Sequence, residues 1–224
     1  MIDVATIAER AEAVRARIVA AGGDPASITL VAVTKGFGPE VAVAAAAAGL
    51  TDLGENYAQE LVPKVEAVAR AGTGHGTEAG SPRWHFLGRL QRNKVRSVAP
   101  HVALWQSIDR ASLGTEVARR APGAAVLVQV NLSGEEQKGG CGRDEAAALV
   151  ETLAGMGLAV RGLMGVAPAG DAEAARPGFA WLAAQVDRLG LDVCSMGMSG
   201  DLDIAVQEGS TMVRVGTDLF GPRG

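Results

Sequence analysis

Eight short apolar runs are spaced along this chain of 224 residues, and their spacing restricts the fold more than any other feature. The runs are rich in Val, Leu and Ile, and alanine-rich or amphipathic segments separate them. This alternation is typical of βα units around a parallel sheet, whose strands are buried on both faces. The predicted strands span residues 29–35, 51–54, 84–88, 104–108, 125–132, 159–166, 192–196 and 212–216.

Helical segments fill the intervals between these strands. They are predicted at residues 39–48, 58–71, 91–99, 111–120, 144–154, 179–189 and 202–208, and another helix precedes the first strand. Eight strands with intervening helices indicate an α/β protein of the closed (β/α)₈ (TIM) barrel type. The alternative is an open doubly wound sheet, which more often carries a glycine-rich dinucleotide loop after its first strand. We therefore expect residues 1–224 to form a single barrel domain with an extra N-terminal helix, and the glycine-rich residues 70–83 to form a surface loop.

Composition narrows the classes of partner. The formal charge of −4, from 25 acidic and 21 basic residues, gives no broad basic face for a phosphate backbone, so no nucleic acid partner is expected. No apolar run reaches transmembrane length and no signal peptide pattern is present, so we expect a cytoplasmic protein without a membrane partner. Cys141 and Cys194 lie far apart in the chain and fit neither a disulfide framework nor a metal site.

Small polar residues and glycines follow the last two predicted strands. The chemistry of a (β/α)₈ barrel lies at the C-terminal ends of its strands, where backbone N–H groups after strands seven and eight commonly bind phosphate. Ser199 and Gly200 after the seventh strand, with Gly216 and Thr217 after the eighth, are therefore candidates for such a site. Any single glycine could instead serve a tight βα turn, but two such clusters on adjacent strands favour phosphate binding.

Lys35 closes the first predicted strand, beside the apolar residues Val31, Val33 and Phe37. Loss of hydration at such a position lowers the pKa of an amine and makes it a nucleophile. Such lysines form Schiff bases with carbonyl compounds, and pyridoxal phosphate is the carbonyl cofactor that also needs a phosphate site. The alternative is a charged lysine that reaches solvent or pairs with Glu55 or a phosphate.

Arg214 lies inside the eighth predicted strand. The alternation of a strand places it on one face with Met212 and Gly216. If that face is the barrel interior, the guanidinium lies below the phosphate turn and, against a pyridine nitrogen, acts only as a donor and keeps the ring unprotonated. The alternative is a buried ion pair with Asp52 or Glu55.

Taken together, the motifs resemble one family over nearly the whole chain. They read "VAVTK", "LGENYAQE", "WHFLGRLQRNK", "SIDR", "VNLSGEEQKGG", "GLMGVAP", "SMGMSGD" and "GSTMVRVGTDLFG". In order and spacing they closely resemble the YggS/PROSC family of pyridoxal phosphate homeostasis proteins. This resemblance implies the barrel of the alanine racemase N-terminal domain and other fold-type III enzymes, without their second, β-rich domain.

The resemblance also implies roles for individual residues. Lys35 would hold pyridoxal phosphate as an internal aldimine, Arg214 would face the pyridine nitrogen, and Ser199, Gly216 and Thr217 would bind the phosphate. Further residues expected near the cofactor are Asn56, His85 and Met196. Lys138 matches a family lysine associated with movement of the cofactor, although a solvated loop lysine is an equal alternative. The chain departs from the family pattern at Arg89, where proline is more usual, and at Gly36-Phe37, where a polar pair is more usual; neither change touches the aldimine lysine or the phosphate turn.

The function implied is that of a carrier rather than an enzyme. Such a protein holds pyridoxal phosphate reversibly and maintains vitamin B6 and amino-acid and keto-acid homeostasis, with apo forms of pyridoxal phosphate enzymes as possible recipients. One alternative is a fold-type III racemase or decarboxylase, which needs an acid or base on each side of the substrate. Another is a Schiff-base phosphosugar aldolase, which would account for Lys35 and the phosphate turn but not for Arg214. No heptad seam is present, so we expect a monomer.

Overall fold

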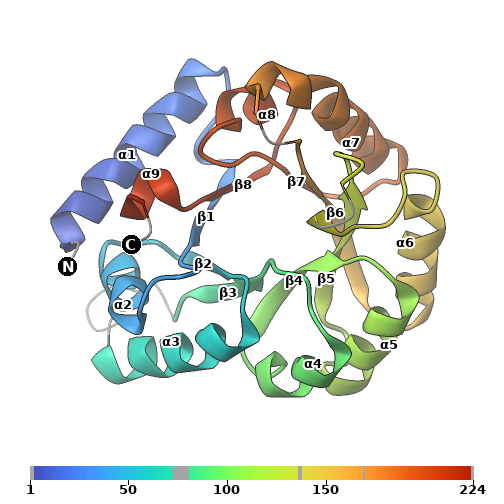
Figure 1. Cartoon of the computed structure of the whole chain (residues 1–224), viewed down its shortest axis with the longest axis horizontal. Helices are drawn as coiled ribbons and strands as arrows, with labels where there is room; N and C mark the ends of the chain where they lie inside the picture. Colours follow the sequence, from blue (N-terminus) through green and yellow to red (C-terminus); the bar gives the residue numbers. More distant parts are fainter. Residues whose placement is uncertain (1–2, 73–80, 136–137, 169, 223–224) are drawn as a thin grey trace.

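The eight predicted strands form a closed parallel barrel, with β1 paired to β8, so the predicted (β/α)₈ fold is confirmed (Figure 1). The computed structural model describes residues 3–72, 81–135, 138–168 and 170–222. Part of the segment expected to be a loop, residues 73–80, lies outside this description. The strands are β1 (Thr29–Val33), β2 (Asp52–Glu55), β3 (Arg83–Phe86), β4 (Val102–Ile108), β5 (Ala125–Asn131), β6 (Ala159–Val166), β7 (Val193–Ser195) and β8 (Met212–Val215).

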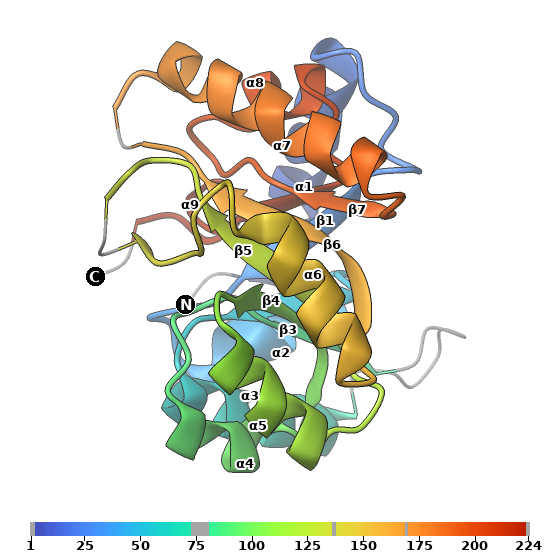
Figure 2. The ribbon, with the colours of Figure 1, turned by 90° about the vertical axis from the view of Figure 1, so that its right-hand side faces the viewer.

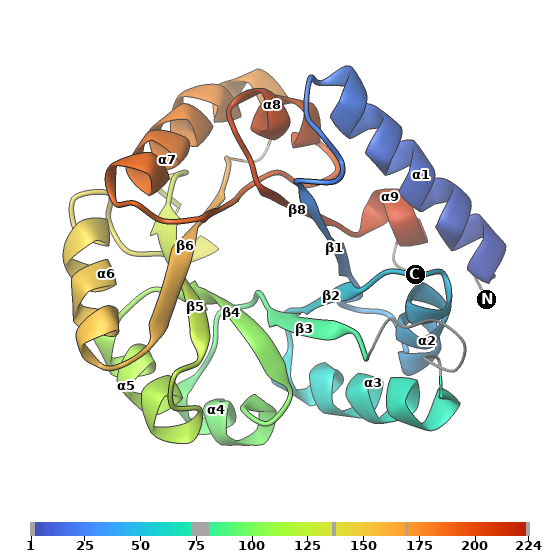
Figure 3. The same ribbon diagram turned by 180° about the vertical axis from the view of Figure 1, so that it is seen from behind.

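Helices surround the barrel, as the two end-on views show (Figures 1 and 3). They are α1 (Val4–Ala20), α2 (Pro39–Ala47), α3 (Ala58–Ala71), α4 (Arg92–Val98), α5 (Ala111–Arg120), α6 (Ala146–Gly155), α7 (Arg176–Arg188), α8 (Leu202–Gln207) and α9 (Thr217–Phe220), with a 3₁₀ helix at Ala172–Ala175. The 3₁₀ helix and α9 were not predicted. Each has only four residues, which is too short for the helical repeat of apolar residues to be visible in the sequence.

The extra N-terminal helix is present as α1. Asp3 caps it, since its carboxylate accepts a hydrogen bond from the Thr6 amide at 2.8 Å. Its buried residues, Ile7, Ala11, Val14 and Ile18, recur at helical spacing and so form one apolar face. This face packs beside α2, α8 and α9 (Figure 1). The first helix of the chain therefore covers the region where the barrel closes.

The core has two parts. Val31, Leu104, Leu127, Met164 and Met212 form a small apolar cluster inside the barrel. A larger cluster fills the space between the strands and the surrounding helices. The side view shows these helices as an outer layer around the strands (Figure 2). On most strands the residues of the two faces alternate between these clusters, as expected for a period of two. A register irregularity in β4 leaves Trp105 and Ile108 both in the larger cluster. Within the residues that the structure describes, no helix is long and apolar enough to span a membrane.

Both cysteines are buried and unpaired, at 7% exposure for Cys141 and 2% for Cys194. Burial raises the pKa of each thiol to about 12, and the nearby Glu145 carboxylate contributes at Cys141. Among the described residues, no group of histidines, cysteines and carboxylates could hold a metal ion.

We expect both thiols of the folded protein to react with a disulfide reagent at pH 8 more slowly than an exposed thiol, by roughly 100-fold or more, because reaction requires the thiolate. Measuring the release of thionitrobenzoate in buffer and in guanidinium chloride checks this. Unfolding should make both thiols react at the rate of a free cysteine. Rapid reaction of either thiol in buffer would contradict the buried positions.

Candidate functional site

The C-terminal ends of the strands surround a cavity of about 420 Å³, here called the Lys35 cavity. This end of a (β/α)₈ barrel is the one that carries chemistry. Six of the eight residues predicted to contact a cofactor line the cavity, namely Lys35, Asn56, Ser199, Arg214, Gly216 and Thr217. They come from the ends of β1, β2, β7 and β8. Closure of the barrel between β8 and β1 therefore brings together residues from both ends of the chain.

The other two predicted residues, His85 and Met196, are not among the side chains that line the Lys35 cavity. His85 points into the barrel interior, where it is 3% exposed and its Nε2 lies 2.9 Å from Asp52 Oδ1. Met196 belongs to the outer apolar cluster, because alternation turns Ser195 inward and the following side chain outward. The geometry does not bring either side chain to the place predicted for a cofactor.

Arg214 is buried, at 5% exposure, and its guanidinium lines the floor of the cavity. Its Nη1 donates to Ser195 Oγ at 2.7 Å, and its Nη2 donates to the Gly165 carbonyl at 2.8 Å. Burial lowers the pKa of Arg214 to about 10, which still leaves the group charged at neutral pH. Within the described part of the chain no carboxylate pairs with it, since Asp52 and Glu55 have other basic partners. The alternative of a buried ion pair at Arg214 is therefore wrong.

A chain of hydrogen bonds continues from Ser195 across the barrel. Ser195 Oγ donates to Gln106 Oε1 at 2.7 Å, and Gln106 Nε2 lies 2.7 Å from His85 Nδ1. An amide nitrogen can only donate, so His85 accepts at Nδ1 and its Nε2 carries the proton that points to Asp52. Burial alone raises the pKa of Asp52, but hydrogen bonds from His85 and Arg83 outweigh it and hold this pKa below its usual range. His85 is thus connected to Arg214, which lines the cavity, through Gln106 and Ser195.

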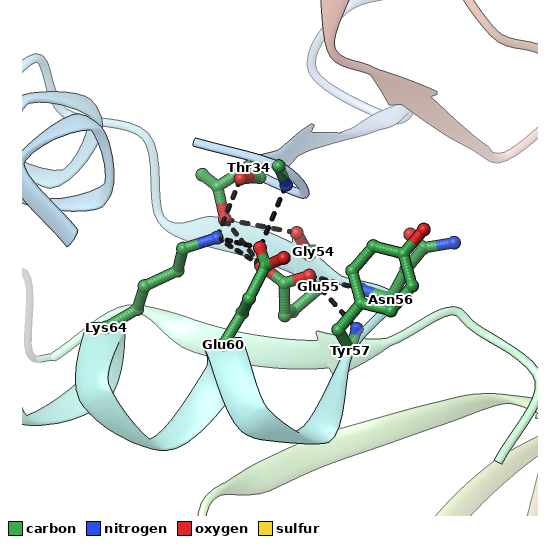
Figure 4. A network of polar contacts seen from close by, with 8 residues as sticks. Thr34, Gly54, Glu55, Asn56, Tyr57, Glu60 and Lys64 are labelled. Carbon is green, nitrogen blue, oxygen red and sulfur yellow. Dashed lines mark hydrogen bonds and ion pairs between the residues drawn. The ribbon is translucent and has the colours of Figure 1, made fainter. Parts of the chain in front are cut away.

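Polar contacts also fix the backbone on both sides of Lys35 (Figure 4). The Thr34 carbonyl accepts a hydrogen bond from Lys64 Nζ at 2.8 Å, and the Gly36 amide donates to Glu60 Oε2 at 2.9 Å. Lys64 itself pairs with Glu60 at 2.9 Å. Burial by itself raises the pKa of Glu60, but the bonds from Lys64 and the Gly36 amide hold it below its usual range. α3 therefore holds the turn that carries Lys35.

Glu55 extends this network to the end of β2. Its Oε2 lies 2.5 Å from Lys64 Nζ, and the two side chains are 0% and 1% exposed. Its Oε1 accepts hydrogen bonds from the amides of Asn56 at 2.6 Å and Tyr57 at 3.1 Å (Figure 4). One buried ion pair thus orients two neighbouring strand ends, and with them Lys35 and Asn56.

The adjacent wall of the cavity, at the ends of β7 and β8, carries donors suited to a phosphate. The Thr217 amide opens α9 and so has no partner inside that helix, while the Ser199 hydroxyl accepts from the Asp218 amide at 3.3 Å. Arg17 of α1 donates two hydrogen bonds of 3.2 Å to the Ser199 carbonyl and pairs with Asp218 at 2.6 Å. A Cβ on Gly216 would lie 3.1 Å from the Val33 carbonyl oxygen, which explains the glycine at this turn.

Lys138 lines the same cavity rather than extending into solvent. Its Nζ donates to the Ala167 carbonyl at 2.9 Å and pairs with Glu135 at 2.6 Å. Gln129 of β5, which the sequence interpretation did not select, also lines the cavity and donates to the Lys138 carbonyl at 2.8 Å. A polar residue at an inward position of an apolar strand is the signal that could have identified Gln129.

The polar groups that line the Lys35 cavity together fit one kind of ligand. A primary amine on one wall, phosphate-type donors on another and a guanidinium on the floor fit a ligand that has a carbonyl group, a phosphate and a ring with an acceptor atom. The fold and these residues define a class: a (β/α)₈ barrel whose C-terminal mouth fits a phosphorylated carbonyl compound. Pyridoxal phosphate has each of these three groups.

Comparison with known proteins identifies the family. Residues 2–224 match the family model of the alanine racemase N-terminal domain. The chain is 41% identical to the pyridoxal phosphate homeostasis protein of Pseudomonas aeruginosa, over 98% of this chain and 97% of that one. It is 37% identical to the pyridoxal phosphate homeostasis protein of Escherichia coli, over 100% and 98% of the two chains. The chain belongs to the alanine racemase N-terminal domain family and, within it, to the YggS/PROSC family of pyridoxal phosphate homeostasis proteins.

Solved structures agree with this assignment. PipY of Synechococcus elongatus, solved with pyridoxal phosphate bound, is 32% identical and superposes with a TM-score of 0.81 over 96% of this chain and 100% of that one. A protein of unknown function from Bifidobacterium adolescentis is 34% identical, with a TM-score of 0.87 over 98% of each chain. The arginine decarboxylase of Paramecium bursaria Chlorella virus, at 10% identity and a TM-score of 0.71 over 97% of this chain and 63% of that one, shares the fold alone.

Proposed function

We propose that the protein binds pyridoxal phosphate reversibly in the Lys35 cavity and maintains the supply of this cofactor, without robust catalysis of its own. One observation carries the proposal: Lys35, Arg214 and the phosphate-type donors of Ser199 and Thr217 line a single cavity. The relatives named pyridoxal phosphate homeostasis proteins and the structure of PipY with pyridoxal phosphate support the same ligand.

Seven of the residues that line the cavity have a proposed role. Lys35 Nζ forms a Schiff base with the aldehyde carbon, and a water molecule is released. The Ser199 hydroxyl and the backbone at Gly216 and Thr217 hold the phosphate. Pyridoxal phosphate supplies an electron sink in enzymes, but Arg214 can only donate to the pyridine nitrogen, so it keeps this sink weak. Asn56 lies near the cofactor, and Lys138 helps the cofactor to enter and leave.

The surroundings of Lys35 favour a carrier over a racemase. A racemase needs an acid or base on each side of the substrate α-carbon. Tyr57 is the only tyrosine in the sequence, it is 46% exposed, and it is not among the described residues that line the Lys35 cavity. This arrangement supports reversible holding of the cofactor rather than turnover of an amino acid.

We extend the proposal to the cellular setting. Residues 1–224 act as one pyridoxal phosphate-binding domain, present as a monomer in the cytoplasm, and apo forms of pyridoxal phosphate enzymes receive the cofactor. The buried, unpaired state of Cys141 and Cys194 suits a reducing compartment. Sedimentation equilibrium tests the monomer, and a mass of two subunits would contradict it.

Replacement of Lys35 by Ala is the experiment that tests the function. Wild-type protein purified with pyridoxal phosphate should show a visible absorption band, and borohydride should fix the cofactor on Lys35. The Lys35→Ala variant should lack both. Peptide mass mapping compares the amount of attached cofactor at Lys35 with the amount at Lys64, Lys94 and Lys138, which are the other lysines of the chain.

The negative outcomes separate the alternatives. Wild-type protein without a band or a label would refute the cofactor and favour a phosphosugar aldolase. A band together with rapid exchange of the α-proton of an added amino acid in deuterium oxide would favour a racemase.

A further inference from the structure

A second cavity, of about 670 Å³, lies at the same end of the barrel beside the ends of β2, β3 and β4. Its lining comes from three segments of the sequence: "NYAQ" at residues 56–59, Phe86 with "RLQ" and Lys94 within residues 86–94, and "DR" at 109–110. The function proposed above accounts for only Asn56 and does not use the other residues. We call this second space the Arg89 cavity.

Cations predominate on the walls of the Arg89 cavity. Arg89, Lys94 and Arg110 line it together with a single carboxylate, Asp109, which gives a local charge of +2 in a chain whose formal charge is −4. Asp109 is already paired with Arg110, and Arg110 Nη2 also donates to the Leu90 carbonyl at 3.0 Å. This pair is therefore a fixed part of the wall.

Arg89 and Lys94 differ from Arg110 in their surroundings. Both are exposed, and among the residues that the structure describes neither side chain has a carboxylate or carbonyl partner. Two cationic groups that face the same cavity repel each other unless an anion lies between them. Guanidinium and ammonium groups both bind carboxylate and phosphate oxygens, the guanidinium in a bidentate geometry.

The remaining lining suits a small organic molecule. Asn56, Gln59 and Gln91 offer neutral polar groups, and the buried side chains of Phe86 and Leu90 contribute an apolar surface. Small-molecule sites combine apolar walls with a few such polar groups in a cavity of this size. A concave space of this kind does not fit the phosphate backbone of a nucleic acid, because that backbone needs a broad basic surface.

We propose that the Arg89 cavity is a second binding site, for a small organic anion that carries a carboxylate or a phosphate group. Arg89 and Lys94 bind the anionic group, while Arg110 with Asp109 shapes the wall. Asn56 and Arg89 line both cavities, so the occupant lies beside the Lys35 cavity. The site does not involve Lys35 and goes beyond the cofactor function.

Site-resolved titration of the cofactor-free protein tests this proposal. Inorganic phosphate and succinate, added in separate ¹⁵N NMR titrations, report on the two anionic groups. We expect saturable shifts at the amides of Gln91 and Asp109 with at least one probe. Shifts at Ser199 and Thr217 would report phosphate in the Lys35 cavity, so the two sites and the two proposals are read separately.

Matched charge removals complete the test. The double variant Arg89→Gln/Lys94→Gln should weaken binding at Gln91 and Asp109 by about tenfold or more, since it removes two charge-assisted contacts. Arg92→Gln/Arg96→Gln removes the same charge from exposed positions of α4 outside the cavity lining, and should change affinity by less than about twofold. The absence of shifts with both probes, or equal affinity in wild type and Arg89→Gln/Lys94→Gln, would overturn the proposal.

Discussion

Replacement of Lys64 by Met should lower the free energy of unfolding by about 3–5 kcal/mol, because removing one partner of a buried ion pair leaves the other charge buried and unpaired. Lys64 is 1% exposed and Glu55 is 0% exposed. The ammonium also donates to the Thr34 carbonyl and pairs with Glu60, so the variant removes three polar contacts at once. Urea denaturation followed by circular dichroism gives the free energy directly.

Two further variants separate the buried charge from other effects of the substitution. In Lys64→Met/Glu55→Gln the remaining amide is neutral and its oxygen can still accept from the amides of Asn56 and Tyr57, so much of the lost stability should return. Arg70→Met, at an exposed position of the same helix, should stay within about 0.5 kcal/mol of wild type. A Lys64→Met protein that is as stable as Arg70→Met would contradict the role of the network.

The same variant tests how Lys35 is positioned. Lys64 and Glu60 hold the Thr34 carbonyl and the Gly36 amide on either side of Lys35. At a temperature where Lys64→Met remains folded, we expect slower borohydride labelling of Lys35 by pyridoxal phosphate. An unchanged labelling rate in the folded variant would limit the network to a stabilising role.

Gly88→Ala should also destabilise the protein strongly. We expect the free energy of unfolding to fall by about 3 kcal/mol, at the upper end of the range for overpacking. A Cβ at this position would lie 2.0 Å from the Asn56 carbonyl oxygen, and backbone atoms cannot move away by changing rotamer. Because Gly88 lines the Lys35 cavity, separation of the ends of β2 and β3 should also weaken binding of pyridoxal phosphate. Thermal melting and titration of the visible absorption band measure the two effects.

Gly200→Ala is the matched control for this prediction. Gly200 lines the same cavity, but a Cβ there would meet no atom within 4 Å. Its stability should equal that of wild type within about 0.5 kcal/mol. Equal melting temperatures for Gly88→Ala and Gly200→Ala would show that the ends of β2 and β3 can separate without cost.

Strand order and helix positions could be predicted from the sequence because each strand is a short apolar run, and the runs are too regularly spaced for most other folds. The face of many strand residues could be predicted too, as Arg214 shows, but the register irregularity in β4 interrupts the alternation and leaves Trp105 and Ile108 both in the larger cluster. The depth of a side chain along the barrel axis could not be predicted. His85 faces inward as a period of two requires, yet it lies in the interior network with Asp52 rather than on the cavity wall.

The burial of Lys64 could not be predicted from the sequence either. A lysine in an amphipathic helix is expected at the surface, because lysine is almost never fully buried unless it is paired. Its partner Glu55 lies nine positions earlier, on another element, so no helical spacing connects them. Contacts of this kind depend on how α3 packs against the ends of β1 and β2, which the pattern of the sequence does not specify.

Closure of the barrel between its first and last strands sets the order in which the site can be assembled during synthesis. Thr29 of β1 pairs with Met212 of β8, and Arg17 contacts Ser199 across 182 positions of the chain. Lys35 therefore leaves the ribosome long before the residues that would hold the phosphate. A nascent chain can have the amine exposed but no cavity around it, so cofactor capture has to wait until β8 and α9 have been synthesised. Local opening where β1 pairs with β8 would release a bound cofactor by reversing that step.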